Sequence, residues 1–226
     1  PAVTILVGAL LTVLTAKYIG AAASSVGNLI VWSTKLHPFW MGILVSVVVG
    51  VALTLPISSA AICAAFGLVG LAGGAAVAGC CAQMVGFAVL SFKENRWGGI
   101  LSQGLGTSML QMPNIIKNPK VWIAPTLASA ITGPIATCLF KMEMNGAAVS
   151  SGMGTCGLVG QIGVITGWFA PSQAAINHGA TAISPTFFNW IGLILICFIL
   201  PGVLCWAFGK VFRKIGWIKD GDLALA

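Results

Sequence analysis

Neutral polar side chains are the groups through which this chain could do chemistry, because its charged residues are few. Amides and hydroxyls both donate and accept hydrogen bonds, and a polar solute such as a sugar is held by a few such groups in fixed positions. The candidates that lie within apolar stretches are Ser58, Ser59, Gln83, Gln111, Asn114, Asn145, Ser150, Ser151, Thr155 and Gln161. The same residue types also join helices in membranes, so we expect about half of this set to touch a ligand.

Two titratable residues complete the candidate binding site. Glu143 lies two residues before Asn145 and has two interpretations: it accepts hydroxyl groups of the solute, or it pairs with Lys141. His37 directly precedes a proline, where it serves either the site or, the interpretation we favour, the start of a helix as a polar cap. Glu94 is expected at the surface, and the other histidine, His178, in a solvated loop.

Catalysis, metal binding and nucleic-acid binding find no support in the residue pattern. The seven cysteines are scattered through apolar stretches and form no ligand pattern with histidine, so they are expected to be small buried apolar groups. No phosphate loop, dinucleotide fingerprint or nucleophile elbow occurs in the sequence. The net charge of +7 comes from basic residues at the ends of apolar segments, where membrane orientation and lipid headgroups account for it. No catalytic residue, metal or cofactor is therefore assigned.

The composition is that of an integral membrane protein. Hydrophobic residues make up 58% of the chain and charged residues 7%, against about 25% charged in soluble domains. No charged residue occurs in 36–92 or in 144–209, and because one crossing needs about 20 residues, each window must hold more than one membrane segment. We expect one all-α, polytopic transmembrane domain over 1–226. The chain starts with Pro1 inside an apolar stretch, so we expect a piece of a longer protein.

Breaks at charged or proline-bearing positions define the expected elements. Loops are predicted at Lys93–Arg96 and over the polar stretch Ala170–Thr186, and Pro125 and Pro134 predict kinks within one of the helices. The predicted membrane helices are Pro1–Ala16, Phe39–Leu55, Ala75–Phe92, Val121–Phe140 and Phe187–Phe208.

The stretch Asn145–Trp168 differs from these helices, because it holds seven glycines and many small polar residues but no charge. It has two interpretations. Glycine allows a chain to break at membrane depth where protein or a water-filled cavity surrounds it, which predicts a re-entrant or broken segment along a solute path. The alternative is one continuous helix packed closely through its small residues. Ile57–Gly74 has the same character, and we expect the two segments to approach each other from opposite faces.

A weak internal repeat relates these two segments. A basic, proline-containing break precedes a helix at 35–40 and again at 117–122, and each helix is followed by Gly-Leu-Val-Gly, at 67–70 and 157–160. We predict an inverted repeat with copies over about 18–74 and 98–164, an arrangement typical of transporters.

The positive-inside rule places the C-terminal basic cluster in the cytoplasm. With Phe187–Phe208 running inward, Lys117 and Lys120 also fall inside. Ile57–Gly74 then becomes a hairpin entering from the inside, and Lys93 and Arg96 fall outside.

Two motif stretches resemble one known family. They are Gly104-Leu105-Gly106-Thr107-Ser108-Met109-Leu110-Gln111-Met112-Pro113-Asn114-Ile115-Ile116 and Gly152-Met153-Gly154-Thr155-Cys156-Gly157-Leu158-Val159-Gly160-Gln161. With the proline-bearing helix between them, they are similar to the phosphotransferase-system EIIC-like membrane family that includes perfringolysin O regulator-like proteins. The resemblance extends from Pro38 to the C-terminus. It implies a sugar permease or a regulator in a bacterial cell membrane, with soluble IIA and IIB proteins as possible partners and a homodimer as the assembly.

Three functions are compatible with these features. The first is a carrier for a sugar or similar polar solute, the second a membrane sensor or regulator that binds a solute without net transport, and the third a structural partner or channel. Paired glycine-rich segments favour the first two. The scarcity of acidic residues disfavours ion coupling, and the absence of a soluble domain bearing a phosphorylated His or Cys leaves phosphoryl coupling undetermined.

Overall fold

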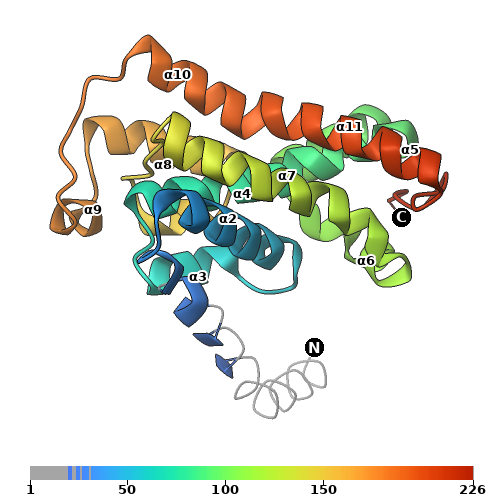
Figure 1. Ribbon diagram of the computed structural model, residues 1–226, viewed down its shortest axis with the longest axis horizontal. Coiled ribbons are helices and arrows are strands. Elements are labelled where there is room, and N and C mark those ends of the chain that lie inside the picture. The colour runs from blue at the N-terminus through green and yellow to red at the C-terminus, as the bar shows by residue number, and fades with distance from the viewer. Residues whose placement is uncertain (1–19, 22–23, 26, 31, 226) are drawn as a thin grey trace, which may run out of the picture.

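The computed structural model describes residues 20–21, 24–25, 27–30 and 32–225. These residues form helices and turns, with no β-strand among them and one isolated bridge between Gly70 and Met144. The all-helical class predicted from the sequence is confirmed (Figure 1). The helix predicted over Pro1–Ala16 lies outside the described residues.

Short α-helices joined by 3-10 and π-helical turns make up the chain. The α-helices are α2 (Pro38–Thr54), α3 (Ser59–Ala65), α4 (Gly70–Leu90), α5 (Phe92–Gly99), α6 (Met112–Lys117), α7 (Ile123–Pro134), α8 (Val159–Phe169), α9 (Gln173–Asn177), α10 (Phe187–Ile194) and α11 (Leu200–Ile215). The π-helical turns are η1 (Ile100–Gly106), η4 (Ile135–Leu139) and η7 (Leu195–Ile199), and the 3-10 turns are η2 (Ser108–Gln111), η3 (Pro119–Trp122), η5 (Ala148–Gly152) and η6 (Cys156–Leu158).

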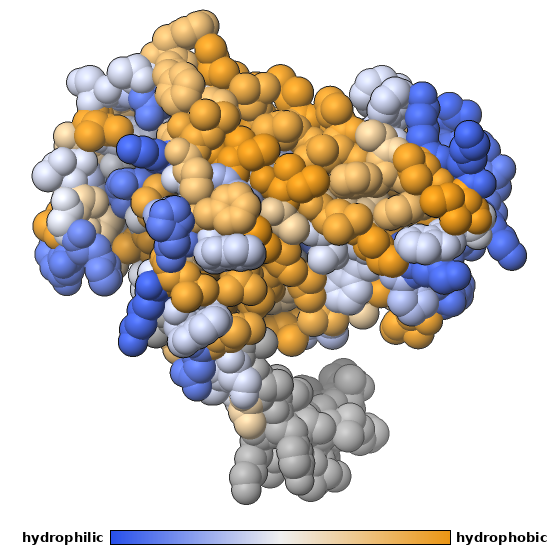
Figure 2. Space-filling model, viewed as in Figure 1, coloured by the Kyte–Doolittle hydropathy of each residue, from blue (hydrophilic) through white to orange (hydrophobic). Residues whose placement is uncertain are grey.

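Among the described residues, three helical stretches are long and apolar enough to cross a membrane: Gly70–Leu90, Pro119–Leu139 and Phe187–Ile215. Pro38–Thr54 and Cys156–Phe169 are apolar but shorter. Large apolar side chains such as those of Ile194 and Val203 are half exposed. Figure 2 shows a broad apolar belt between two more hydrophilic ends. Apolar surface of this extent is unfavourable in water. The chain is therefore a multi-pass membrane protein.

The long helices pack as a bundle in which α7 runs against α2. Ser46 Oγ of α2 donates to the carbonyl oxygen of Ser129 in α7 at 2.8 Å, and Thr137 Oγ1, one turn past α7, donates to that of Pro38 at 2.9 Å. These pairs show that α2 and α7 are antiparallel. In contrast, α2 and α4 run in the same direction, since Thr54 near the end of α2 donates to Gln83 late in α4.

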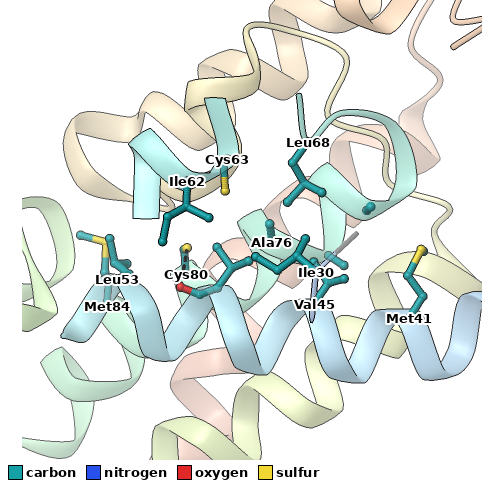
Figure 3. Close-up of a cluster of buried hydrophobic side chains, with 13 residues drawn as sticks. Ile30, Met41, Val45, Leu53, Ile62, Cys63, Leu68, Ala76, Cys80 and Met84 are labelled. Carbon is teal, nitrogen blue, oxygen red and sulfur yellow. Dashed lines mark hydrogen bonds between the residues drawn. The ribbon is translucent and has the colours of Figure 1, made fainter. Parts of the chain in front are cut away.

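Small residues allow α2 and α4 to pack closely at the centre of this bundle. A Cβ atom on Gly79 would lie 1.9 Å from the carbonyl oxygen of Ser46, so no other residue fits there. The parallel direction requires the chain to return between the two helices. It does so through α3, and the side chains of Ile62, Cys63 and Leu68 from this return pack on Val45 and Cys80 (Figure 3).

The glycine-rich segments are both interrupted. In 57–74, α3 ends at Ala65, and Gly67 and Gly70 adopt φ values of +57° and +66° before α4 begins. In 145–168, two 3-10 turns precede α8, with positive φ at Gly154, Gly157 and Leu158. A single packed helix over Asn145–Trp168 is therefore excluded. Each Gly-Leu-Val-Gly lies at the turn where an α-helix starts.

The two segments contact each other deep in the molecule. Ser59 Oγ donates to the carbonyl oxygen of Gly152 at 2.7 Å, and Ser151 Oγ donates to that of Leu68 at 2.6 Å. A Cβ atom on Gly154 would lie 2.7 Å from the Cβ atom of Cys80, so close packing accompanies the break in the helix.

The structure does not show Ile57–Gly74 as a hairpin that enters and leaves at one end of the bundle. Backbone hydrogen bonds of 3.0 Å join Gly70 and Met144, near the start of α2 and the end of the α7 stretch. The segment thus crosses back along α2 instead of returning to the end from which it came. The physical reason is the parallel packing of α2 and α4.

The predicted loop at Lys93–Arg96 is wrong. Residues Phe92–Gly99 form α5, although Arg96 has non-helical angles of φ 52° and ψ −144°. Lys93 and Arg96 were expected on the face opposite the C-terminal basic cluster, but Lys93 Nζ lies 2.7 Å from Asp220 Oδ1 in the C-terminal segment. Glu94, expected at the surface, is nearly buried and bonded to Arg213 at 2.9 Å. Ion pairing therefore joins α5 to α11 at one end of the bundle.

We call the two ends of the bundle by their residues. The basic end holds α5, α6, the start of the α7 stretch and the end of α11, where Lys120 Nζ lies 5.9 Å from the centre of the Trp217 ring. The Asn145 end holds the start of α2, α4 and α10 and the end of the α7 stretch. Both ends are hydrophilic in Figure 2.

Candidate solute-binding site

The predicted site residues do not meet at one place. Gln111 and Asn114 lie at the basic end, whereas Glu143 and Asn145 lie at the opposite end. Ser59, Gln83, Ser150, Ser151, Thr155 and Gln161 are buried between them. His37 and Ser58 are exposed helix caps of α2 and α3, accepting hydrogen bonds from the backbone N–H groups of Phe39 and Ala61. Capping is the role we favoured for His37.

A cavity of about 370 Å³ at the Asn145 end has the composition of a binding site. The turn after the α7 stretch contributes Glu143 and Asn145, and α8 contributes Trp168 near its end. The polar loop after α9 contributes Thr181, and α10 contributes Asn189. Four separate stretches of the chain thus converge on one hollow, and a drug-sized or sugar-sized molecule fits this volume.

Asn145 is the central residue of this cavity. Its side chain is 7% exposed, and its Nδ2 donates to Glu143 Oε2 at 2.8 Å. Its Oδ1 has no hydrogen-bond partner. Among the buried side-chain nitrogen and oxygen atoms that the structure describes, the other atom without a partner is Ser102 Oγ. A buried polar atom left unpaired costs about 1–3 kcal/mol. Oδ1 itself is shielded from solvent, so a ligand hydroxyl that recovered this free energy would first have to displace the atoms that cover it.

Local backbone geometry explains why Asn145 is held in place. Its carbonyl oxygen accepts a hydrogen bond from Ser172 N at 2.8 Å, and Met144 is bonded to Gly70. The carboxylate of Glu143 is on an exposed residue beside it and makes no ion pair with Lys141 within 4.0 Å. Of our two interpretations of Glu143, pairing with Lys141 is therefore wrong, and the carboxylate is free to accept solute hydroxyls.

Aromatic rings form the other side of the cavity. The ring of Trp168 packs edge-on against that of Trp190, with centroids 4.9 Å apart, and Phe140 stacks on Phe188 at 4.9 Å. An aromatic face beside a carboxylate and amides can bind a molecule that has apolar C–H faces and polar hydroxyl edges. Sequence reasoning missed Trp168 and Asn189. The sequence signal that could have indicated Trp168 is its position two residues before the start of the polar stretch Ala170–Thr186.

The buried polar residues in the middle of the bundle are satisfied by protein. Gln83 Oε1 accepts from Trp122 Nε1 at 3.0 Å and from Thr54 Oγ1 at 3.3 Å, and its Nε2 donates to Ser129 Oγ at 3.4 Å. Thr155 Oγ1 lies 3.6 Å from Met84 Sδ. Gln161 bonds within α8 and its preceding turn when its amide is oriented to donate to the carbonyl oxygens of Gly154 and Leu158. In this conformation these side chains join helices.

Gln111 and Asn114 bind the C-terminal segment. Gln111 Nε2 donates to the carbonyl oxygen of Leu223 at 3.0 Å, and Asn114 Nδ2 donates to that of Ala224 at 2.9 Å. Asn114 also donates to Gln111 Oε1 at 2.8 Å. Both amide nitrogens are thus bonded to protein, at the end of the bundle opposite Asn145. The structure does not bring Gln111 and Asn114 together with Asn145, and the part each plays in solute binding stays a prediction.

Comparison with known proteins identifies the family. Residues 1–225 match a family model described as phosphotransferase system, EIIC. The chain belongs to this family. No curated protein and no solved structure matches it. EIIC membership confirms the resemblance seen in the two motif stretches, and it implies a solute substrate and phosphotransferase partners.

Proposed function

We propose that this EIIC-family chain is a permease for a sugar or similar polar solute, and that the cavity around Asn145 is its solute-binding site. The unpaired Oδ1 of Asn145, buried beside the Glu143 carboxylate, carries the proposal. Trp168 supplies an apolar face and Asn189 a further amide. No group in the cavity is assigned a catalytic role, and phosphoryl transfer belongs to the soluble partners that the family implies.

We propose further that the basic end faces the cytoplasm. Eight basic residues lie there: Lys93, Arg96, Lys117, Lys120, Lys210, Arg213, Lys214 and Lys219. Only Lys35 and Lys141 lie at the Asn145 end among the described residues. An excess of Lys and Arg in cytoplasmic loops sets orientation. In this orientation the C-terminal segment is cytoplasmic, and the solute cavity opens to the outside of a bacterial cell membrane.

The inverted repeat and the re-entrant character of Asn145–Trp168 belong to this proposal. Antiparallel α2 and α7, each preceded by a proline-containing cap, support the repeat. Asn145 and Trp168 line the same cavity, while Thr155 between them reaches Met84, 14 residues into α4. At 1.5 Å per residue this depth is about 20 Å. The segment would thus enter from and return to the Asn145 face.

A matched pair of asparagine variants tests the binding site. Asn145 and Asn114 are buried to similar extents, at 7% and 8% exposure, but lie at opposite ends. Asn145→Ala should weaken solute binding about 5- to 150-fold, the equivalent of 1–3 kcal/mol, because a ligand hydroxyl loses its acceptor. Asn114→Ala should lower the melting temperature and leave affinity intact. Solute-induced thermal shifts on both variants measure the difference.

An unchanged ligand-induced shift in folded Asn145→Ala protein would reject the site. Uptake of labelled sugars into proteoliposomes then distinguishes the carrier from a sensor. Accumulation inside the vesicles supports the carrier, and binding without accumulation supports the sensor or regulator.

A further inference from the structure

The basic end holds a second cavity that the solute site does not use. It has a volume of about 390 Å³ and lies between the end of α4, α5 and α11. Its lining combines apolar side chains, among them Val89, Phe92 and Trp206, with four cationic residues that include Arg96 and Lys210. We propose that this groove binds an anionic phospholipid, with the headgroup phosphate between Arg96 and Lys210 and an acyl chain along the apolar side chains.

Arg96 and Lys210 are the two cations in the groove that form no ion pair with a described residue. Lys93 pairs with Asp220 at 2.7 Å, and Arg213 pairs with Glu94 at 2.9 Å. Arg96 and Lys210 have no acidic partner within 4.0 Å among the described residues. Two free positive charges in one hollow favour an anionic occupant.

The position of the groove favours a lipid over a soluble anion. Trp206 and Val203 on α11 are 54% and 57% exposed, and α11 belongs to the stretch Phe187–Ile215, which is long and apolar enough to cross a membrane. Lys210 Nζ lies 3.7 Å from the centre of the Trp206 ring, an arrangement typical of the membrane–water boundary. The groove thus combines exposed apolar surface of a membrane helix with basic side chains. Basic pockets of this kind between membrane helices bind anionic headgroups.

The backbone at Arg96 presents its side chain to the groove. Its φ of 52° interrupts α5 about one turn after that helix begins at Phe92. A non-glycine residue rarely adopts this conformation. At this interruption of α5, Arg96 lines the same groove as Lys210.

Native mass spectrometry of the full chain in detergent tests the proposal. Phosphatidylglycerol, phosphatidylcholine and inorganic phosphate are each titrated against wild type, Arg96→Gln/Lys210→Gln and Lys214→Gln/Lys219→Gln. The last variant also loses two charges from exposed positions near the C-terminus, outside the groove. We expect wild type to bind phosphatidylglycerol in preference to phosphatidylcholine. The groove variant should lose about 30-fold in affinity, since each basic residue near an anionic surface contributes roughly fivefold, and the control variant should lose less than fivefold.

Three outcomes would overturn the lipid site. One is equal loss in both double variants, which would indicate diffuse surface attraction. Another is unchanged phosphatidylglycerol binding in the groove variant. The third is displacement of phosphatidylglycerol by millimolar inorganic phosphate, which would identify a free-anion site. Circular dichroism of each variant verifies folding. If Arg96→Gln fails to fold, Arg96→Gly is a second variant that removes the charge, because glycine adopts a positive φ without steric cost. None of these results depends on the solute cavity.

Discussion

Two buried asparagines, Asn145 and Asn114, show that the residue type alone does not determine which contacts a side chain makes. Asn145 and Asn114 have the same side chain and are buried to similar extents. The amide oxygen of Asn145 is buried without a partner, whereas the amide nitrogen of Asn114 donates to Gln111 and Ala224. Both were predicted in the solute site, because an amide in an apolar stretch must find a partner. The partner itself comes from distant residues.

Arg96→Gly should stabilise the protein in lipid-free detergent by about 1–3 kcal/mol, the usual cost of a strained non-glycine conformation. Arg96→Ala is the matched control, since it removes the same charge but keeps the strain. Chemical denaturation followed by tryptophan fluorescence measures both. Equal stabilities of the two variants would show that the backbone at Arg96 carries no strain.

At the scale of elements, the glycine-rich segments combine a left-handed turn with close packing. Gly154→Ala and Gly157→Ala separate these two effects, because both residues have φ +53°, but only at Gly154 would a Cβ atom clash with Cys80. Gly157→Ala should cost about 1–2 kcal/mol from φ alone. Gly154→Ala should cost about 1–3 kcal/mol more from overpacking. Thermal unfolding of the two variants gives the comparison, and equal destabilisation would contradict the packing at Gly154.

The C-terminal segment is an element whose docking should weaken in acid. The hydrogen bond and charge of Lys93 lower the pKa of Asp220 below its usual value. A carboxyl whose pKa is lower in the folded state stabilises that state above its unfolded pKa of about 3.9, and this contribution is lost as pH falls through the folded value.

The protection factors of amides in 216–225, which correct for the intrinsic pH dependence of exchange, should therefore fall below about pH 4. In Asp220→Asn the protection factors should already be lower at neutral pH and should change less on acidification. Parallel acid responses in the two proteins would show that the Lys93–Asp220 pair does not hold the segment.

At the scale of the whole molecule, the distribution of charge between the two ends predicts orientation. Single cysteines at position 178, in the Asn145-end loop, and at position 214, at the basic end, are placed in a variant whose exposed Cys138 is replaced. A membrane-impermeant thiol reagent applied to intact cells should label position 178 and spare position 214. The reverse pattern would invert the proposed topology. The homodimer stays a prediction, and a monodisperse monomer by mass in mild detergent would contradict it.

The sequence by itself determined the class of this protein, the positions of its main membrane helices and its family. A long charge-free window such as 144–209 is typical of a chain in a bilayer. Pro38 and Pro119 each stand at the first position of a helix, a preference that does not depend on distant contacts. These properties are local or compositional, so they can be inferred without contacts.

Tertiary structure alone decided which faces meet. Apolar surfaces of different helices are interchangeable by composition, and the pairing depends on where small residues such as Gly79 let two backbones approach. That pairing made α2 and α4 parallel and sent Ile57–Gly74 across the bundle. It brought Trp168 and Asn189 to Asn145 and placed Arg96 beside Lys210. The physical reason is that these pairings depend on how closely two backbones can approach in three dimensions, which the hydropathy pattern does not specify.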